Sequence, residues 1–294
     1  MGPFIEIISK PDNIAIVVMI LMVLFFTFWA FQQAIKNDAL RRRGEPIEGE
    51  FDGKVDTWKP LVRIEFIIAL IVFIGLTFWS LVVDAPLEEL ANPTLTPNPA
   101  KAPWYFLGLQ EMLVYFDPWI AGVVLPTLII IGLIAIPYID INPKGNGYYT
   151  FSERKWAILI FCFGFLFLWI LLIVIGVFFR GPGWLWFWPW EAWDHHRVIY
   201  EGTTDLTNLV GIESRSGWGF FIGGGVVTIY YALGMILPYL YWKKKKPEFL
   251  KSLGMVPYIT VSFLFWTMLA LPIKMFLRLV LMVKYVWVTP WFNI

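Results

Sequence analysis

The chain has 294 residues, of which 59% are hydrophobic and only 15% charged, and its mean hydropathy is +0.67. The formal net charge of +1 gives no support for nucleic-acid binding, so no nucleic-acid partner is expected. The single cysteine, Cys162, cannot form a disulfide within the chain, and there is no CxxCH motif to attach a c-type haem. This composition is that of a membrane protein.

Apolar runs of roughly 20 residues match a hydrocarbon core about 30 Å thick. Lipid offers no partner for unpaired backbone groups, so such runs must be helical. The sequence therefore predicts an all-α polytopic membrane protein with about six transmembrane helices plus interfacial amphipathic helices. The first run is expected to be a retained helix, because it is too long for a signal peptide and lacks a cleavage site. The runs cover residues 12–34, 62–84, 119–139, 156–179, 217–241 and 255–273.

Lysine and arginine are concentrated in alternate loops. Segments 35–60, 140–155 and 242–256 are basic, and the last contains four consecutive lysines, whereas loop 85–118 holds only Lys101. The positive-inside rule places the basic segments in the cytoplasm. Both termini and the loops 85–118 and 180–216 are then expected on the other side.

Ionisable groups within the spans are scarce. The sequence has no chain of carboxylates for a proton pump, and no span contains a histidine, so the chain cannot supply bis-histidine ligation for a b-type haem. His195 and His196 are adjacent and project in different directions. An interface or hydrogen-bonding role is favoured for them over a metal site.

Loop 180–216 begins with Gly181-Pro182-Gly183, which should end the fourth helix, and five tryptophans follow between residues 184 and 193. Such a cluster is typical of a membrane-interface belt, and walling a quinone or cofactor cavity is the alternative.

Three shorter patterns carry local predictions. Thr150-x-x-Glu153 is a candidate capping box for the fourth span, and Gly219-x-x-x-Gly223 predicts close packing against another helix. Segment 274–294 is expected to be an interfacial amphipathic tail, with a tilted seventh span as the weaker alternative.

The segment Asn98-Pro99-Ala100-Lys101-Ala102-Pro103-Trp104-Tyr105-Phe106 is polar and proline-rich and lies between two spans. An irregular, aromatic-tipped loop just outside a membrane span is a place where a protein can meet a lipid-soluble substrate. A short amphipathic helix over 104–116 is expected to follow it.

The order of span, proline-rich loop, short helix and two further spans resembles the C-terminal domain of cytochrome b in quinol:cytochrome c oxidoreductases, which in its split form is subunit IV. The family's motif Pro-Glu-Trp-Tyr is matched here by Ala102-Pro103-Trp104-Tyr105. Gly122-x-x-x-Pro126 and Ile136-Pro137-Tyr138 also resemble the family's next helix. The likeness covers about 60–180. It implies that Pro103, Trp104, Tyr105 and Phe106 shape a quinol pocket.

The family's motif glutamate falls on Pro103, which cannot carry a proton. Trp104, Gly108 and Glu111 share one helix face, so Glu111 is the hypothesised proton acceptor, supported by Tyr105. Glu88 and Glu89 are alternatives. The competing interpretation is that Glu111 is a solvated residue on a polar face.

The resemblance implies a subunit of a bc-type complex that oxidises ubiquinol or menaquinol at the non-cytoplasmic face, without independent activity. Haem b, haem c and a Rieske iron–sulfur cluster are then expected on partners. These are a four-helix cytochrome b subunit, a Rieske protein and a c-type cytochrome, in a complex expected to be dimeric. The resemblance also implies a bacterial inner membrane.

The expected organisation has three parts. Residues 1–60 form an extra helix and cytoplasmic loop, 61–180 a cytochrome b C-terminal-like core, and 181–294 an aromatic loop, two further helices and a tail. The extra helices and the lost glutamate favour the alternative function of a non-catalytic membrane anchor in a larger respiratory or photosynthetic redox assembly. A secondary transporter is disfavoured, since no inverted repeat is evident.

Overall fold

The computed structural model describes residues 3–47, 57–84, 90, 92–141, 149–200 and 202–294. Its elements are helices, and the only β-structure among these residues is three isolated bridges. Within the described ranges, six helices are long and apolar enough to cross a membrane, at Asn13–Arg43, Trp58–Val82, Ile120–Ile139, Phe151–Phe179, Gly217–Lys245 and Met255–Leu279. The predicted all-α polytopic membrane fold is confirmed, and each span overlaps its predicted apolar run.

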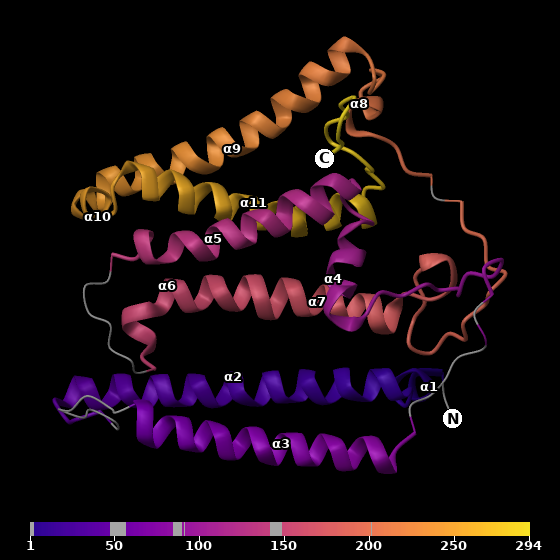
Figure 1. The fold of residues 1–294 in the computed structure, drawn as a ribbon. Coiled ribbons are helices and arrows are strands. Elements are labelled where there is room, and N and C mark those ends of the chain that lie inside the picture. Colours follow the sequence, from indigo (N-terminus) through magenta and orange to yellow (C-terminus); the bar gives the residue numbers. More distant parts are fainter. Residues whose placement is uncertain (1–2, 48–56, 85–89, 91, 142–148, 201) are drawn as a thin grey trace. The chain divides into compact units, whose positions relative to one another are not determined.

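Short stretches of π-helix begin the second and third spans. The fourth span is built from two α-helical and two π-helical pieces, with a kink at Arg154 near its start (Figure 1). The elements are α1 (Pro3–Ile8), α2 (Pro11–Arg43), η1 (Thr57–Leu61), α3 (Val62–Val82), α4 (Trp104–Met112), η2 (Ile120–Val124), α5 (Leu125–Ile139), α6 (Phe151–Phe161), η3 (Cys162–Trp169), α7 (Ile170–Val174), η4 (Ile175–Phe179), η5 (Pro182–Trp184), α8 (Leu206–Leu209), α9 (Gly217–Lys245), α10 (Pro247–Leu253) and α11 (Met255–Leu279).

The chain divides into two compact units. One comprises residues 8–97 and 147–155, and the other comprises residues 1–7, 98–146 and 156–294. In the first, α2 continues past the predicted end of its span, so the charged segment 36–43 is helical rather than part of a loop. Gly44 ends the helix with a φ of 72°, and the N–H groups of Gly44 and Glu45 return to carbonyls of the last turn.

The start of α6 is held by α2 within this same unit. Asp38 accepts hydrogen bonds from the Ser152 backbone N–H at 2.9 Å and from its hydroxyl at 2.8 Å. Glu153, the last residue of the predicted capping box, forms an ion pair with Arg41. The pattern therefore located the helix start, but a residue from another helix accepts the hydrogen bond from the Ser152 amide.

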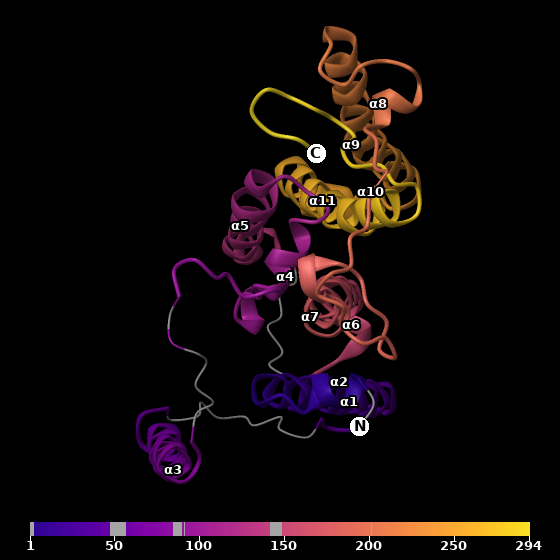
Figure 2. The ribbon, with the colours of Figure 1, turned by 90° about the vertical axis from the view of Figure 1, so that its right-hand side faces the viewer.

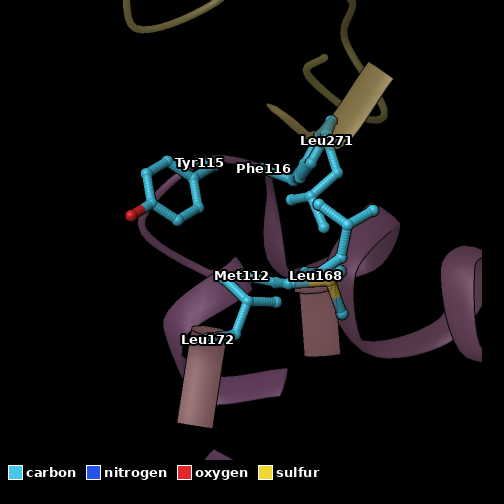
Figure 3. Close-up of a cluster of buried hydrophobic side chains, with 7 residues drawn as sticks. Met112, Tyr115, Phe116, Leu168, Leu172 and Leu271 are labelled. Atoms are coloured by element: carbon cyan, nitrogen blue, oxygen red, sulfur yellow. The ribbon is translucent and has the colours of Figure 1, made fainter. Parts of the chain in front are cut away.

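The core of the second unit lies where α4 and the turn after it meet the fourth span and α11 (Figure 3). Tyr115 and Leu172 are almost fully buried there. Gly108 of α4 lies directly against the Trp169 ring, because a Cβ at Gly108 would be 3.4 Å from that ring. The short helix predicted over 104–116 is thus present as α4, and one of its faces is packed. The other core side chains are Met112, Phe116, Ala121, Leu168 and Leu271.

α9 and α11 lie side by side and are joined through α10, as both ribbon views show (Figures 1 and 2). Gly234 allows their close approach, since a Cβ there would be 2.6 Å from the Trp266 ring. The Tyr230 hydroxyl donates to the Trp266 carbonyl oxygen at 2.7 Å and fixes the register of the two helices.

The segment predicted as a tail is helical only at its start. Helix α11 ends at Leu279, and residues 280–294 are irregular, so the alternative of a tilted seventh span over 274–294 does not form. Instead Val283 forms an isolated β-bridge with Thr204, and Trp287 packs on Gly223. Of the two predicted glycine contacts, Gly223 therefore meets the chain's own tail, while Gly219 lies against the backbone of Glu213 and Ser214, and neither meets another helix. Backbone pairing within the tail supplies the hydrogen bonds that a helix would have provided. The interfacial position of the tail stays a prediction.

Candidate functional site

The first turn of α4 carries the three aromatic residues predicted for the quinol pocket. Trp104, Tyr105 and Phe106 are 40%, 51% and 52% exposed, and their neighbouring ring centroids lie 5.7 Å and 4.7 Å apart. Pro103 precedes the helix in an extended conformation, with φ of −50°. A proline is well suited to this position, because it lacks the N–H that a helix start would leave unpaired. We call Trp104, Tyr105 and Phe106 the aromatic tip.

The loop before the aromatic tip is fastened to the end of the fourth span. The Lys101 ammonium donates to the Val177 carbonyl oxygen at 2.8 Å and lies 4.8 Å from the centre of the Trp193 ring. This cation sits at the carboxyl end of a helix, where positive charge is favoured. The Asn98 side-chain oxygen accepts from the Gly183 N–H at 2.6 Å. Both contacts fix where the loop enters α4.

Gln110 ties the same loop back to α4. Its side-chain oxygen accepts from the Ala102 N–H at 2.8 Å, and its amide donates to the Ala100 carbonyl oxygen at 2.9 Å. The aromatic tip is therefore presented by a loop held at several points, and such preorganisation lowers the ordering cost of binding.

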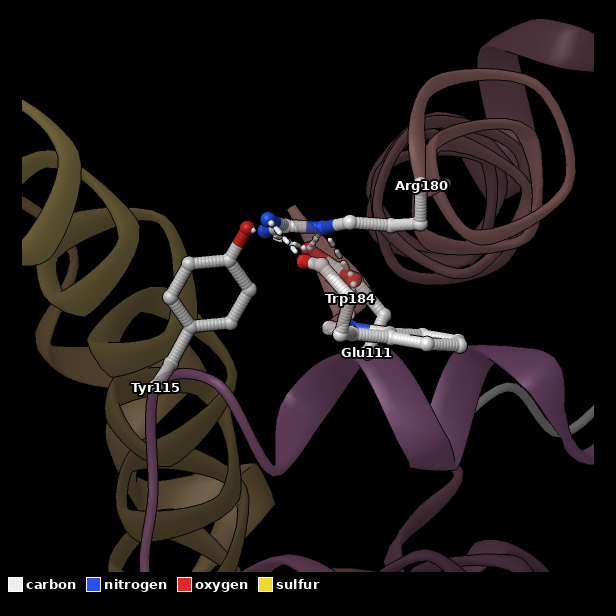
Figure 4. Close-up of polar contacts among 4 residues, drawn as sticks. All are labelled: Glu111, Tyr115, Arg180 and Trp184. Carbon is white, nitrogen blue, oxygen red and sulfur yellow. Dashed lines mark hydrogen bonds and ion pairs between the residues drawn. The ribbon is translucent and has the colours of Figure 1, made fainter. Parts of the chain in front are cut away.

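Glu111, at the other end of α4, is fully buried in a polar cluster (Figure 4). Arg180 donates to it from Nε to Oε2 at 2.9 Å and from Nη2 to Oε1 at 2.7 Å. The Tyr115 hydroxyl donates to Oε1 at 2.8 Å, and the Trp184 indole N–H donates to Oε2 at 3.1 Å. The interpretation of Glu111 as a solvated polar-face residue is therefore wrong. We call these four residues the Glu111 cluster.

Burial and the adjacent Glu111 together shift the pKa values of Tyr115 and Arg180. Burial raises the pKa of Tyr115, and the adjacent Glu111 carboxylate raises it further, so the phenol stays a donor. Burial alone would lower the pKa of Arg180, but its hydrogen bonds and charge interaction with Glu111 outweigh burial and raise it. Arg180 also donates from Nη1 to the Trp184 carbonyl oxygen at 3.1 Å.

The predicted site residues thus fall into two groups. The aromatic tip, with Tyr105, is exposed at the start of α4, whereas Glu111 is enclosed and bonded to Tyr115 rather than to Tyr105. Tyr115 follows Glu111 by four residues, a spacing that the sequence displays. Arg180 is 69 positions from Glu111, and no spacing in the sequence indicates that the two residues meet. Glu88 and Glu89 lie outside the described residues.

The tryptophan-rich loop takes part in this arrangement. Trp184 joins the Glu111 cluster, while Phe179, Trp186, Trp188 and Trp190 form a continuous series of ring contacts. The last two rings are stacked with an interplanar angle of 2°, and Trp190 is 72% exposed. The loop therefore combines an interface-type surface with one buried structural contact.

His195 and His196 lie on the surface after this loop, and the His196 backbone N–H donates to the Asp194 carboxylate at 2.8 Å. Across the described part of the chain, no three His, Cys, Asp or Glu side chains are grouped closely enough to hold a metal ion.

Comparison with known proteins finds a family likeness for part of the chain. Residues 90–177 match the model described as cytochrome b (C-terminal)/b6/petD. The chain is 28% identical over 113 residues to the menaquinol:cytochrome c reductase cytochrome c subunit of Geobacillus thermodenitrificans. That alignment covers 36% of this chain and 45% of the relative, so the chain spans less than half the length of the relative it matches. No solved structure matches.

The matched segment contains the loop before α4, the aromatic tip, Glu111 and the third and fourth spans up to Val177. It begins after the span at Trp58–Val82, which the resemblance read from the sequence had included. Residues 90–177 of this chain are therefore similar to the cytochrome b C-terminal family.

Proposed function

We propose that the chain is a membrane subunit of a bc-type quinol:cytochrome c oxidoreductase and contributes to its quinol-oxidation site. The observation that carries the proposal is the aromatic tip, which is exposed at the start of α4 inside the family-matched segment. Residues 61–180 are then the functional core, and the flanking segments 1–60 and 181–294 are additions to it.

The aromatic tip offers apolar ring faces against which a quinol head group would pack. Pro103 and the fastened loop before it would keep these faces in one arrangement. Menaquinol is the substrate to test first, because the Geobacillus relative is named a menaquinol:cytochrome c reductase subunit. Ubiquinol is the alternative.

The role of Glu111 as a proton acceptor stays a prediction. Protonation would leave the buried Arg180 without its counter-charge, and losing one partner of a buried ion pair costs about 3–5 kcal/mol. We therefore propose Glu111 primarily as a positioning residue that holds α4 against the end of the fourth span. Proton acceptance is the competing role, and it requires the ion pair to open during turnover.

Electrons would leave the quinol through partners. The proposal assigns these roles to a haem-b-bearing four-helix cytochrome b subunit, a Rieske iron–sulfur protein and a c-type cytochrome, in a dimeric complex at a bacterial inner membrane. In this arrangement the aromatic tip and both termini face the non-cytoplasmic side, as the distribution of lysine and arginine predicts.

The proposal is tested on the complex purified through a tag on this chain. Haem b, haem c and a Rieske centre should co-purify, and the preparation should reduce cytochrome c with menaquinol. Trp104→Ala should lower kcat/KM for menaquinol with little change in thermal stability. The matched control is Trp190→Ala, which removes a more exposed indole outside the aromatic tip.

The alternative function is a non-catalytic anchor of a redox assembly. Pro103 in place of the family's acid, together with the enclosure of Glu111, favours it. Co-purification of redox partners with unchanged turnover in Trp104→Ala would support the anchor. A preparation without haem b or a Rieske centre would overturn the oxidoreductase proposal.

A further inference from the structure

A cavity of about 300 Å³ adjoins the Glu111 cluster. Three of its lining residues are cationic, namely Arg180, Arg278 and Lys284, and its described lining contains no aspartate or glutamate. Apolar side chains of Leu113, Val114 and Phe116 from the turn after α4 line it as well. The cavity thus joins a cationic wall to an apolar one.

Two of the cations in this wall differ in their surroundings. Arg180 is paired with Glu111, but Lys284 is exposed, with its ammonium 5.3 Å from the centre of the Tyr285 ring. Asp117 and Asp205, which act on Tyr285 through space, do not line the cavity. Asp117 is already engaged by the Asn293 side-chain amide at 3.2 Å.

The cavity lies where three spans begin or end. Its lining comes from the turn just before Ile120, from the loop just after Phe179, and from the segment that includes the end of α11 at Leu279. In a membrane-spanning chain these positions coincide with the lipid headgroup level. Phosphate groups are concentrated there, and lysine and arginine are the side chains that bind them, arginine through paired N–H donors.

We propose that this cavity binds a phosphate group, supplied by the headgroup of an anionic phospholipid, with Lys284 and Arg278 as its cationic contacts. The apolar wall made by Leu113, Val114 and Phe116 suits the start of an acyl chain. Bound lipid would connect the turn after α4 to the tail. The proposal does not depend on quinol oxidation.

The test uses the full-length chain in neutral detergent, with the midpoint of thermal unfolding as readout. Ligands that bind the folded state raise this midpoint. Phosphatidylglycerol should raise it, and phosphatidylcholine, which carries no net charge, should not. Lys284→Gln should abolish most of the rise. Lys251→Gln, which removes an exposed lysine on α10 away from the cavity, should retain it.

Inorganic phosphate distinguishes the two sources of the group. If phosphate alone reproduces the rise, the cavity binds the anion without the lipid. If only phosphatidylglycerol does, the lipid is the ligand. An equal rise with phosphatidylcholine, or a full rise in Lys284→Gln, would overturn the proposal. Native mass spectrometry of retained lipid in Lys284→Gln and Lys251→Gln gives a second readout if the former variant is less stable from the outset.

Discussion

The guanidinium of Arg180 and the carboxylate of Glu111 join two segments 69 positions apart, through an Nη2–Oε1 contact of 2.7 Å in which Glu111 is fully buried. One residue is the first after the fourth span, and the other is on the short helix that carries the aromatic tip. This ion pair is therefore one of the contacts that fix the position of that helix, and the first predictions concern it.

Removing either partner of this pair should be costly. We expect Glu111→Ala and Arg180→Ala each to destabilise the chain by about 3–5 kcal/mol, because each leaves a buried charge unpaired. The double variant should lose less than the sum of the two. Chemical denaturation in detergent measures these differences. As a control, Lys251→Ala breaks the exposed 3.7 Å pair with Glu248 and should change stability little. If the losses from Glu111→Ala and Arg180→Ala simply add in the double variant, the two residues are not coupled.

Glu111→Gln separates positioning from proton transfer. If Glu111 positions α4, menaquinol oxidation should fall in parallel with stability while the pH–rate profile keeps its shape. If Glu111 accepts the proton, activity should be lost at unchanged stability, and the profile should lose one limb. Steady-state rates across pH, with thermal midpoints of the same samples, decide between these outcomes.

Tyr115 gives a pH-dependent contribution to stability. Its pKa is raised above the ordinary value near 10, so the folded state keeps the phenol proton where the unfolded state loses it. The contribution is complete below about pH 10 and declines as pH rises further. Tyr115→Phe should cost about 1.5–3 kcal/mol at neutral pH and flatten this alkaline decline. Tyr200→Phe, at a residue that is 95% exposed, should leave the curve unchanged.

Lys101 should hold the loop before the aromatic tip in its observed conformation. Lys101→Met keeps the length of the side chain but removes its bond to Val177 and its position beside the Trp193 ring. We expect a loss of about 1–3 kcal/mol and faster amide hydrogen exchange in residues 98–103. Unchanged exchange in this segment would show that Lys101 does not fasten the loop.

Gly234 tests the contact between α9 and α11. Gly234→Ala places a methyl group 2.6 Å from the Trp266 ring, which should destabilise the chain by about 1–3 kcal/mol. Gly225→Ala on the same helix meets nothing within 4 Å and should be neutral or stabilising by up to about 1 kcal/mol. The ordering of the two thermal midpoints is the measurement.

The spans could be predicted from the sequence because hydropathy and helix length are local properties that the bilayer imposes on each segment separately. The aromatic tip was also visible, as a short motif between two spans. Arg180 as the partner of Glu111 was not, since a lone arginine at a span end resembles an ordinary interfacial charge. The irregular course of residues 280–294 was not predicted, because their backbone pairing with Thr204 is a long-range contact that composition does not encode.

Every side chain described on α3 is exposed, from Val62 to Val82. Replacing one apolar residue there by another should therefore leave the stability of the isolated chain unchanged. In the assembled complex, the same substitutions would change stability only where another subunit covers the helix. Substitutions along α3, with stability measured in the isolated chain and in the complex, would thus identify the positions that contact a neighbouring subunit. Positions that face lipid should show no change in either measurement.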